Sequence, residues 1–445
     1  MRRILLTAMG SGQGKTVVTC ALLAALKRRG MDVRAFKCGP DYIDPMFHSR
    51  VLGVPSRNLD LFLQGREGVE RSLRETAGEI AVLEGAMGYY DGRNGTDEAS
   101  AYALTRLTET PAVLILRPKG AGLSLAAQVR GMQLFRENSG LCAVLLSDCD
   151  ERTFRRLGPL LERETGLPVL GWLPHSPDAE LNSRHLGLVT AAEIDGLSAR
   201  FDRLAERLEK TADLDALLAL ASEGETTQPR RSLAAPSCRI AAARDEVFCF
   251  CYADTLEALE RAGAELRFFS PLRDAALPEA EGLYLPGGYP ELYAEALAAN
   301  TALRAQIAAA VRAGMPTVAE CGGFLYLQQE LEDERGRSFP QCGALPGRGF
   351  RTDRLQRFGY AHLEAAEDSL LFRRGERVPI HEFHYWDSTE NGASLRCVKA
   401  DGGSWAFGYA DAALYAGFPH LCFSGTVPLA ERFVKACTVY GKRVM

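Results

Sequence analysis

A glycine-rich loop that carries a lysine near the N-terminus constrains the fold of this chain more than any other feature. Residues 10–16 read GSGQGKT, follow the apolar run 4–8 and precede a helical pattern over 15–29 that ends at Gly30. Backbone amides of such a loop bind phosphate, and its lysine reaches the outer phosphates. The pattern therefore predicts a nucleotide site, although Met9 stands where the strict motif has glycine. A flexible surface turn is the alternative interpretation.

Apolar runs and helical stretches alternate along the rest of the chain. Helices that separate strands are typical of βαβ units and a parallel sheet. A charged amphipathic pattern over 196–220 predicts one helix, and the polar, proline-bearing stretch 222–237 predicts a linker. We expect two α/β domains with parallel sheets, over 1–190 and 237–445, joined by a helix and linker over 191–236. The strands are expected at 4–8, 33–37, 80–84, 112–116, 142–146, 169–173, 240–243, 266–269, 283–285 and 315–319, with a helix at 254–261.

Composition excludes several classes of protein. The 445 residues include 52 Lys and Arg against 57 Asp and Glu, and this near balance, without a basic block, argues against nucleic acid as the main partner. The longest apolar runs, such as 111–116, are too short to span a bilayer. The 12 cysteines show no metal-ligand spacing, which indicates reduced thiols in a cytoplasmic chain. No heptad or broad apolar face decides whether the chain forms a homodimer.

Acidic residues follow two of the expected strands. The loop CGPDYIDP comes directly after Lys37 and carries Asp41 and Asp44, while VLEGAMGYYDG carries Glu84 and Asp91. Ligands of α/β proteins bind at the carboxyl ends of the strands, and Mg²⁺ prefers oxygen ligands. Taken singly, each acid is as well explained as a helix cap or turn former. Their clustering beside a phosphate loop favours a magnesium site formed by two of them.

We expect the hydroxyl of Thr16 and the carboxylates of Asp41 and Glu84 to be the ligands of this magnesium ion.

A second constellation lies in the C-terminal half. MPTVAECGGF, residues 315–324, predicts a strand, a tight turn at Cys321 and a helix, which is the arrangement of a nucleophile elbow. The helix amides should lower the pKa of the thiol and stabilise an oxyanion. Upstream, LPGGYPE offers backbone amides at Gly287 and Gly288, and His420 is the expected base. The alternative for Cys321 is a small buried side chain packed under a helix.

His381 and His384, in PIHEFHYW, are the competing candidates for the base.

These motifs resemble known families. The N-terminal half resembles dethiobiotin-synthetase-like P-loop ligases, and the C-terminal half resembles class I glutamine amidotransferases. The order of FKCGPDYIDP, VLEGAMGYYDG, RHLGLV, AECGGFLYL and HEFHYW is similar to that of the cobyrinic acid a,c-diamide synthase family, over nearly the whole chain.

The resemblance implies an ATP-binding amidoligase domain and a glutaminase domain, with ATP, Mg²⁺, L-glutamine and the corrinoid cobyrinic acid as cofactor and substrates. The glutaminase would use Cys321 as nucleophile and His420 as base, with Gly288 and Gly322 holding the oxyanion. Lys37, Asp44 and Asp91 would lie where the substrate carboxylate meets the γ-phosphate. ATP would be bound by Gly10, Ser11, Gly12, Gln13, Gly14, Lys15 and Thr16.

The chain departs from the family pattern at three places. Met9 is one, and the strand after residue 112 ends in Leu-Arg-Pro-Lys where relatives often have Val-Asp-Ala. The third is Cys422, which follows His420-Leu421 where many class I glutaminases carry a glutamate, so the third member of the triad is undefined.

The substrate and the class of protein have alternatives. Hydrogenobyrinic acid and nickel-sirohydrochlorin would undergo the same chemistry, and a P-loop nucleotide-switch ATPase is a different class. A ring with several carboxylates should contact basic side chains, and two segments provide them. The candidates are Arg348, Arg351, Arg354 and Arg357, with Arg184 and His185 earlier in the chain; a solvated basic stretch is the alternative.

Overall fold

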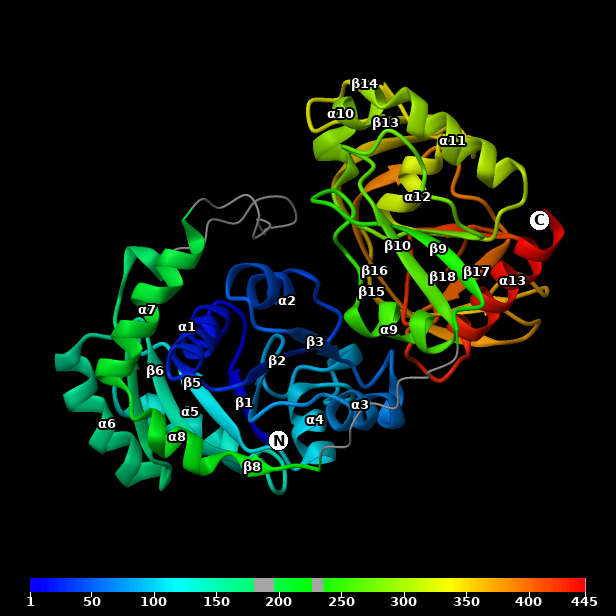
Figure 1. The fold of residues 1–445 in the computed structure, drawn as a ribbon. Coiled ribbons are helices and arrows are strands. Elements are labelled where there is room, and N and C mark those ends of the chain that lie inside the picture. Colours follow the sequence, from blue (N-terminus) through cyan, green and yellow to red (C-terminus); the bar gives the residue numbers. More distant parts are fainter. Residues whose placement is uncertain (180–195, 226–234, 445) are drawn as a thin grey trace. The chain divides into compact units, whose positions relative to one another are not determined.

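A computed structural model describes residues 1–179, 196–225 and 235–444, and the structural statements below concern these residues. Arg184 and His185 lie outside them. The chain forms two compact units, Met1–Leu61 with Gly65–Pro229 and Phe62–Gln64 with Arg230–Met445 (Figure 1).

The first unit is built on one sheet with the strand order β3-β2-β4-β1-β5-β6-β7, all parallel. Helices α3 to α6 bury their apolar residues against one face, whereas α1 packs on α7 at the opposite face (Figure 1). The strands are β1 Arg2–Ala8, β2 Val33–Cys38, β3 Ser56–Leu59, β4 Ile80–Glu84, β5 Ala112–Leu116, β6 Leu141–Ser147 and β7 Val169–Leu173. The helices are α1 Lys15–Arg28, α2 Ile43–Met46, α3 Gly65–Arg74, α4 Ala101–Thr108, α5 Leu123–Leu134, α6 Glu151–Thr165, α7 Leu197–Thr211 and α8 Leu214–Leu220.

The second unit contains two sheets. The first has the order β10-β9-β11-β12-β20-β19 and is parallel except for its β19–β20 edge. Helices α10 to α12 bury one of its faces, and the other face packs on α9, α13 and the second sheet. Its strands are β9 Cys238–Ala243, β10 Ala264–Phe269, β11 Gly282–Leu285, β12 Thr317–Glu320, β19 Tyr409–Ala410 and β20 Leu414–Gly417; the helices are α9 Ala253–Arg261, α10 Ala294–Ala299, α11 Thr301–Arg312, α12 Gly322–Leu327 and α13 Leu429–Val444.

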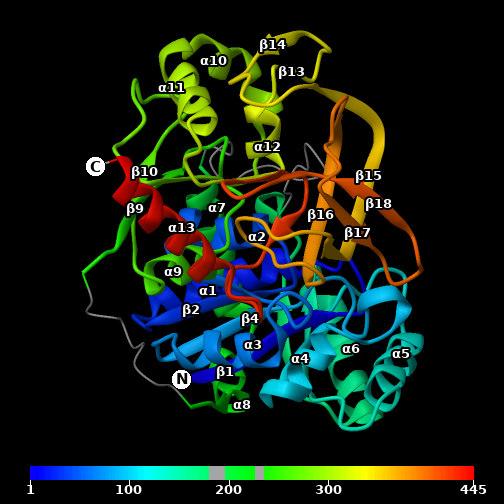
Figure 2. The same cartoon turned by 90° about the vertical axis from the view of Figure 1, so that its right-hand side faces the viewer.

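The second sheet is largely antiparallel and is dominated by the long hairpin of β15 and β16, which lie side by side in Figure 2. Strand β16 alternates buried and partly exposed residues, as a sheet with one covered face requires. This sheet was not expected from the sequence. Its strands are β13 Glu330–Glu332, β14 Ser338–Pro340, β15 Arg348–Ala365, β16 Arg377–Ser388, β17 Leu395–Val398, β18 Ser404–Phe407 and β21 His420–Leu421.

The expected α/β class and the expected strands are confirmed, but the prediction of a single helix over 196–220 is wrong. The stretch 196–220 is broken into α7 and α8, because Ala212 is extended and the Asp213 N–H donates to the Leu170 carbonyl of β7 at 2.7 Å. The expected linker begins with strand β8, Ser222–Glu223, which pairs antiparallel with β1. Both departures come from backbone bonds to strands distant in the sequence, which local periodicity does not report.

All 12 cysteines lie in the described part of the chain, and each is a free thiol. None of the helices within 1–179, 196–225 and 235–444 has the length and apolar character that a membrane span requires.

Candidate functional site

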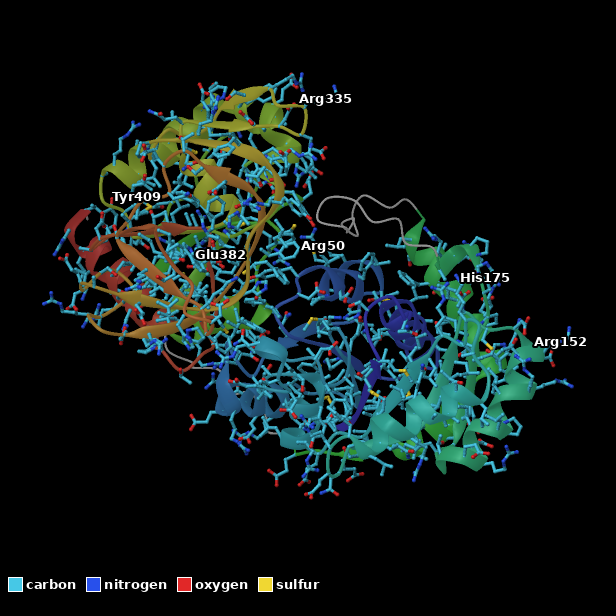
Figure 3. All side chains as sticks on the ribbon, turned by 180° about the vertical axis from the view of Figure 1, so that it is seen from behind. Arg50, Arg152, His175, Arg335, Glu382 and Tyr409 are labelled. Carbon is cyan, nitrogen blue, oxygen red and sulfur yellow. The ribbon has the colours of Figure 1, made fainter. Side chains whose placement is uncertain are left out.

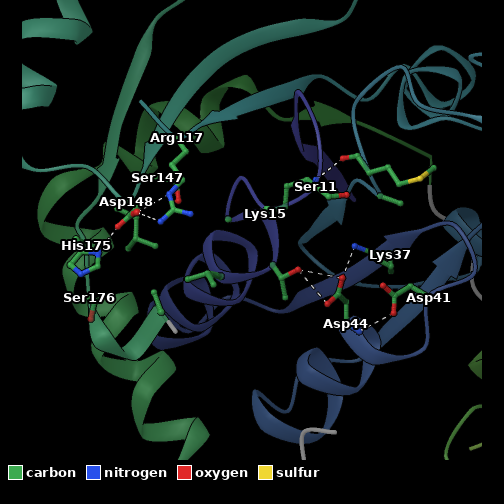
Figure 4. A pocket seen from close by; sticks show the side chains of 18 of the residues that line it. Ser11, Lys15, Lys37, Asp41, Asp44, Arg117, Ser147, Asp148, His175 and Ser176 are labelled. Atoms are coloured by element: carbon green, nitrogen blue, oxygen red, sulfur yellow. Dashed lines mark hydrogen bonds and ion pairs between the residues drawn. The ribbon is translucent and has the colours of Figure 1, made fainter. Parts of the chain in front are cut away.

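A cavity of about 680 Å³ lies at the carboxyl edge of the first unit's sheet (Figure 4). It is lined by the loops that follow β1, β2, β4, β5, β6 and β7. Ligands of open parallel sheets bind at this edge, because the strand ends and the helix N-termini meet there. The glycine-rich loop forms one wall, through Ser11, Gly12, Gly14, Lys15 and Thr16.

The loop that precedes α1 has the local geometry of a phosphate cradle. Gly12 and Gly14 adopt left-handed backbone angles, with φ of 74° and 88°, which explains glycine at these positions. Lys15 folds back over the loop and donates from its ammonium group to the carbonyls of Gly10, at 2.9 Å, and Met87. Burial, followed by the charge of nearby Lys37, lowers the pKa of Lys15 to about 8. The arrangement suits a polyanion, which would replace these carbonyls as the partner of the lysine.

Gln13, in the same loop, contacts the loop after β5: its side-chain oxygen accepts the backbone N–H of Arg117 at 3.2 Å.

Beside the loop, an oxygen-rich cluster forms around Thr16. Its hydroxyl donates to Glu84 Oε1 at 2.7 Å and lies 3.3 Å from Asp44 Oδ1. The ammonium group of Lys37 lies 2.5 Å from Asp44 Oδ2 and 3.0 Å from Glu84 Oε1, and His48 Nε2 lies 3.2 Å from Glu84 Oε2. Apart from Thr16, all of these side chains are buried. A buried cation therefore compensates two buried carboxylates, as their desolvation requires.

The charges in this cluster control one another's pKa values. Burial alone would lower the pKa of Lys37, but Asp44 and Glu84 hold it well above its ordinary value. Burial would raise the pKa of Glu84, but Lys37 and the hydrogen bond with His48 lower it. Burial and the charge of Glu84 raise the pKa of Asp44. Lys37 is therefore held cationic and Glu84 anionic.

Asp41 and Asp91 serve the backbone in this structure. Asp41 Oδ1 accepts the N–H groups of Ile43, at 2.7 Å, and Asp44, at 3.3 Å, and Asp91 Oδ2 accepts the Gly88 N–H at 2.8 Å. The helix-cap and turn-former alternative thus describes both acids, although the Asp41 side chain also lines the cavity.

Of the three expected magnesium ligands, Thr16 and Glu84 are in contact, and Asp44 occupies the position expected of Asp41. A hydroxyl and two carboxylates are the oxygen donors that Mg²⁺ prefers, so the cluster fits that ion. Among the described residues, no group of three or more His, Cys, Asp and Glu is arranged to hold a metal.

Three residues that the sequence analysis did not select meet at the other end of the cavity (Figure 4). Arg117, Asp148 and His175 follow β5, β6 and β7. Arg117 Nε donates to Asp148 Oδ2 at 2.7 Å, and His175 Nδ1 lies 2.5 Å from Asp148 Oδ1. Burial would raise the pKa of Asp148, but the bonds with His175 and Arg117 lower it. The only signal in the sequence was the position of each residue just beyond an apolar strand.

In the second unit, Cys321 occupies a strained turn between β12 and α12. Its φ of 47° and ψ of −102° are unusual for a residue with a side chain, and its N–H donates to the Gly417 carbonyl at 2.8 Å. Gly323 is required behind it, because a β-carbon there would lie 2.1 Å from the Leu285 carbonyl oxygen. This is the geometry of a nucleophile elbow.

The pKa of Cys321 differs from the expectation. Burial, followed by the charges of Glu291 and Glu382, raises it, although the adjacent Gly322 N–H acts in the opposite direction. The expected lowering by helix amides is therefore wrong for the resting thiol, because the side chain is buried among acids. A thiol in this state needs a base to remove its proton.

The segment Gly287–Gly288 contacts both the elbow and the expected base. The backbone nitrogen of Gly288 lies 3.0 Å from where a β-carbon on Gly322 would stand, and a β-carbon on Gly287 would lie 2.4 Å from His420 Cε1. The structure thus brings together Cys321, Gly322, Gly288 and His420 in one buried site.

The three histidines have different surroundings. His420 is buried, and burial and the neighbouring His381 and His384 lower its pKa to about 3, so it is neutral near pH 7. His384 stacks on Phe418, with ring centroids 3.8 Å apart, and its Nε2 lies 3.1 Å from Glu382 Oε1. His381 pairs with His420 through the backbone of β16 and β21. The contact with Gly287 therefore favours His420 as the base.

The four arginines of the expected substrate surface lie on β15. Arg348 lies 3.6 Å from Glu332, Arg351 donates to the Glu334 carbonyl at 3.1 Å, and Arg357 lies 3.4 Å from Asp387. The guanidinium group of Arg354 is exposed and makes no hydrogen bond or ion pair within the described part of the chain.

Models of protein families match both units. Residues 4–189 match the CobQ/CobB/MinD/ParA nucleotide binding domain, and residues 239–426 match the CobB/CobQ-like glutamine amidotransferase domain. Together with the two sites, these matches define a glutamine-dependent amidotransferase of the ligase class that has a nucleotide-binding domain.

The chain belongs to the cobyrinate a,c-diamide synthase family. It is 36% identical to the cobyrinate a,c-diamide synthase of Clostridium acetobutylicum, over 98% of this chain and 100% of the relative. The enzymes of that name from Listeria innocua and Salmonella typhimurium are 38% and 37% identical, with 95% and 97% of this chain and 96% and 97% of the relatives covered.

Proposed function

We propose that this chain uses ATP and glutamine to convert the a and c acetate carboxylates of cobyrinic acid into amides. The observation that carries the proposal is that one chain holds both a phosphate cradle beside an acidic cluster and a strained cysteine elbow. The names of the relatives support the substrate. The two family models support nucleotide use in the first unit and glutamine use in the second.

In the first unit, a carboxylate oxygen of the substrate attacks the γ-phosphorus of ATP, and ADP leaves. The product is an acyl phosphate, whose phosphate is a good leaving group. Lys15 neutralises charge that develops on the transferred group. Thr16 and Glu84, with Asp41 or Asp44, would hold Mg²⁺, which screens the phosphate charges when bound. Lys37, Asp44 and Asp91 orient the substrate carboxylate, in the role that the family resemblance gives them.

In the second unit, His420 takes the proton of the Cys321 thiol, and the thiolate attacks the amide carbon of glutamine. The backbone amides of Gly288 and Gly322 hold the oxyanion. Ammonia leaves with the proton from His420, and water then hydrolyses the thioester to release glutamate. The ammonia attacks the acyl phosphate, which forms the amide and releases phosphate. Because ammonium is not a nucleophile, the ammonia must reach the acyl phosphate unprotonated.

Two groups of alternatives remain. Hydrogenobyrinic acid and nickel-sirohydrochlorin offer similar carboxylates, and no described residue is seen to distinguish the central metal. A P-loop nucleotide-switch ATPase would need neither Cys321 nor the Gly287–Gly288 segment.

The test is a mass assay on cobyrinic acid, hydrogenobyrinic acid and nickel-sirohydrochlorin, with the wild type and Cys321→Ser. We expect the mass change of two hydroxyl-to-amino exchanges on cobyrinic acid, dependent on ATP and glutamine. Cys321→Ser should lose the glutamine-driven reaction and regain it with ammonium, whereas Cys342→Ser, which changes a buried thiol that the mechanism does not use, should remain active. Preference for another ring would change the substrate. No amidation of any ring, with ammonium supplied, would refute the function.

A further inference from the structure

A buried carboxylate directly precedes the expected nucleophile and has no role in the mechanism above. Glu320 ends β12, is 1% exposed, and lies one residue before Cys321. A buried carboxylate is costly unless other groups compensate it, so its contacts indicate what it does.

Those contacts connect Glu320 to the strand that carries the expected base. Oε1 accepts the backbone N–H of Leu421 at 3.0 Å, and Oε2 accepts the hydroxyl of Tyr284 at 3.2 Å. The same Oε2 lies 4.0 Å from Nδ1 of His420, which is an ion-pair distance. The carboxyl group is therefore fixed by two donors and faces the imidazole.

Two other acids influence Cys321 but have different contacts. Glu382, labelled among the strands of the second unit in Figure 3, lies 3.1 Å from His384 through Oε1. Glu291 and Glu382 both raise the pKa of the thiol through their charges. Glu320, in contrast, lies at ion-pair distance from His420, 4.0 Å from its Nδ1. The residues after His420 are Leu421 and Cys422, so an acid two positions beyond the base is absent from this chain.

We propose that Glu320 is the positioning residue of His420, and that it supplies from β12 the acidic group of the glutaminase site. Its carboxylate keeps the Nδ1 side of the ring turned toward β12, which leaves Nε2 to accept the proton of the Cys321 thiol. It then stabilises the imidazolium that this transfer creates. The inference rests on the proposed roles of Cys321 and His420.

The charge of Glu320 has two effects of opposite sign, which makes the proposal testable. Acting directly on Cys321, it opposes the thiolate and raises the pKa of the thiol. Acting through His420, it favours the pair of thiolate and imidazolium. Removal of the charge therefore makes Cys321 more reactive if only the direct effect exists, and less reactive if Glu320 acts through the histidine.

The pH dependence follows from the same contacts. Burial raises the pKa of Glu320 to about 8, while the Leu421 N–H and the Tyr284 hydroxyl lower it. The charged and titratable groups around the pair are Cys251, Tyr284, Glu291, Cys321, His381, Glu382, His384 and Tyr415. The carboxylate form increases as the pH rises toward 8, so kcat/KM for glutamine hydrolysis should rise over that range.

The experiment compares wild type, Glu320→Gln and Glu382→Gln in the full chain. It measures glutamine hydrolysis against pH, and the alkylation rate of Cys321 by iodoacetamide above pH 8, with the modified peptide identified by mass. Glu320→Gln keeps the size and the acceptor oxygen but removes the charge. We expect its kcat to fall about 100-fold with little change in KM. Alkylation of Cys321 should slow by about tenfold, and the rise toward pH 8 should disappear.

Glu382→Gln is the matched control, because it removes an equally buried charge near Cys321 whose carboxylate pairs with His384. It should leave alkylation unchanged or faster. Faster alkylation or unchanged kcat in Glu320→Gln would overturn the proposal. Equal loss of glutamine- and ammonium-driven amidation, with a lower Tm, would show a structural role and overturn it as well. Absence of glutaminase activity in the wild type, or its persistence in Cys321→Ala, would instead refute the proposed function.

Discussion

Replacement of Gly288 by alanine tests whether the close approach of the Gly288 backbone to the turn at Cys321 is needed for the oxyanion site. The backbone of Gly288 has a φ of 154°, and an added β-carbon would stand 1.6 Å from the carbonyl oxygen of Val247. A β-carbon essentially never lies closer than 3.0 Å to such an atom. The added carbon and the Val247 carbonyl oxygen must therefore move apart by at least 1.4 Å, the difference between 3.0 and 1.6 Å. The Val247 carbonyl also accepts the Tyr289 N–H at 2.9 Å, so this separation would break or distort that hydrogen bond.

The expected loss follows from the displacement. A shift of about 1 Å in a positioned catalytic group costs roughly 100-fold in rate, and loss of one oxyanion donor costs about 100- to 1,000-fold. The unfavourable φ adds about 1–3 kcal/mol to the cost of the native backbone. We therefore expect the kcat of glutamine hydrolysis to fall at least about 100-fold, while ammonium-driven amidation is retained because its site lies in the other unit.

The assay measures glutamate release and ammonium-driven amidation on the same preparations, together with Tm. Gly314→Ala is the control: it also has a positive φ, of 80°, but no atom lies within 4 Å of the added carbon. That variant should lose about 1 kcal/mol of stability and keep its glutaminase activity. Glutaminase activity within twofold of the wild type in Gly288→Ala would refute the argument.

The remaining predictions concern the first unit and the basic strand. Lys37→Met should lower the free energy of unfolding by about 3–5 kcal/mol, because two buried carboxylates lose their cation; chemical denaturation measures this. Thr16→Ala should raise the Mg²⁺ concentration needed for amidation and leave glutamine hydrolysis intact. The pKa of Lys15 is lowered to about 8, so its charge is lost above that pH, and ATP affinity should fall by up to about tenfold per pH unit there. Replacement of Arg351 and Arg357 by alanine should raise the corrinoid KM without changing glutamine hydrolysis.

Each of these predictions has a control. Lys37→Arg retains the cation, and equal loss of stability in it would contradict the charge argument. If Thr16→Ala has the Mg²⁺ requirement of the wild type, its hydroxyl is not a ligand. Lys15→Arg should bind ATP without the change above pH 8, and a shared pH dependence would assign the titration to another group. Parallel loss of both activities in the arginine variants would mean a structural role for β15.

Local patterns in the sequence were sufficient for the fold class and for the backbone geometry of the glycine loop and of the turn at Cys321. The loop around Lys15 and the elbow at Cys321 each lie within about ten consecutive residues, where an apolar strand, a glycine turn and a helix follow one another. Such segments specify their own backbone geometry, so most of the expected strands agree with the structure within a few residues. The antiparallel sheet was missed because its longest strand, β15, is rich in charged residues and mostly exposed or half-buried, so it lacks the alternating apolar pattern of a strand.

Tertiary structure decided which side chains stand together at each site. The sequence offered Asp41 and Asp44 equally, but the turn after β2 directs Asp41 to backbone amides and Asp44 to Thr16. It offered no sign that Glu320 faces His420, because these residues are 100 positions apart and meet only when β12 and β21 are in place. The reactive side chains that are present, and their order along the chain, are thus properties of the sequence. Which buried charges come into contact depends on where the strands begin and end, because a shift of one residue along a strand turns a side chain to the opposite face of the sheet.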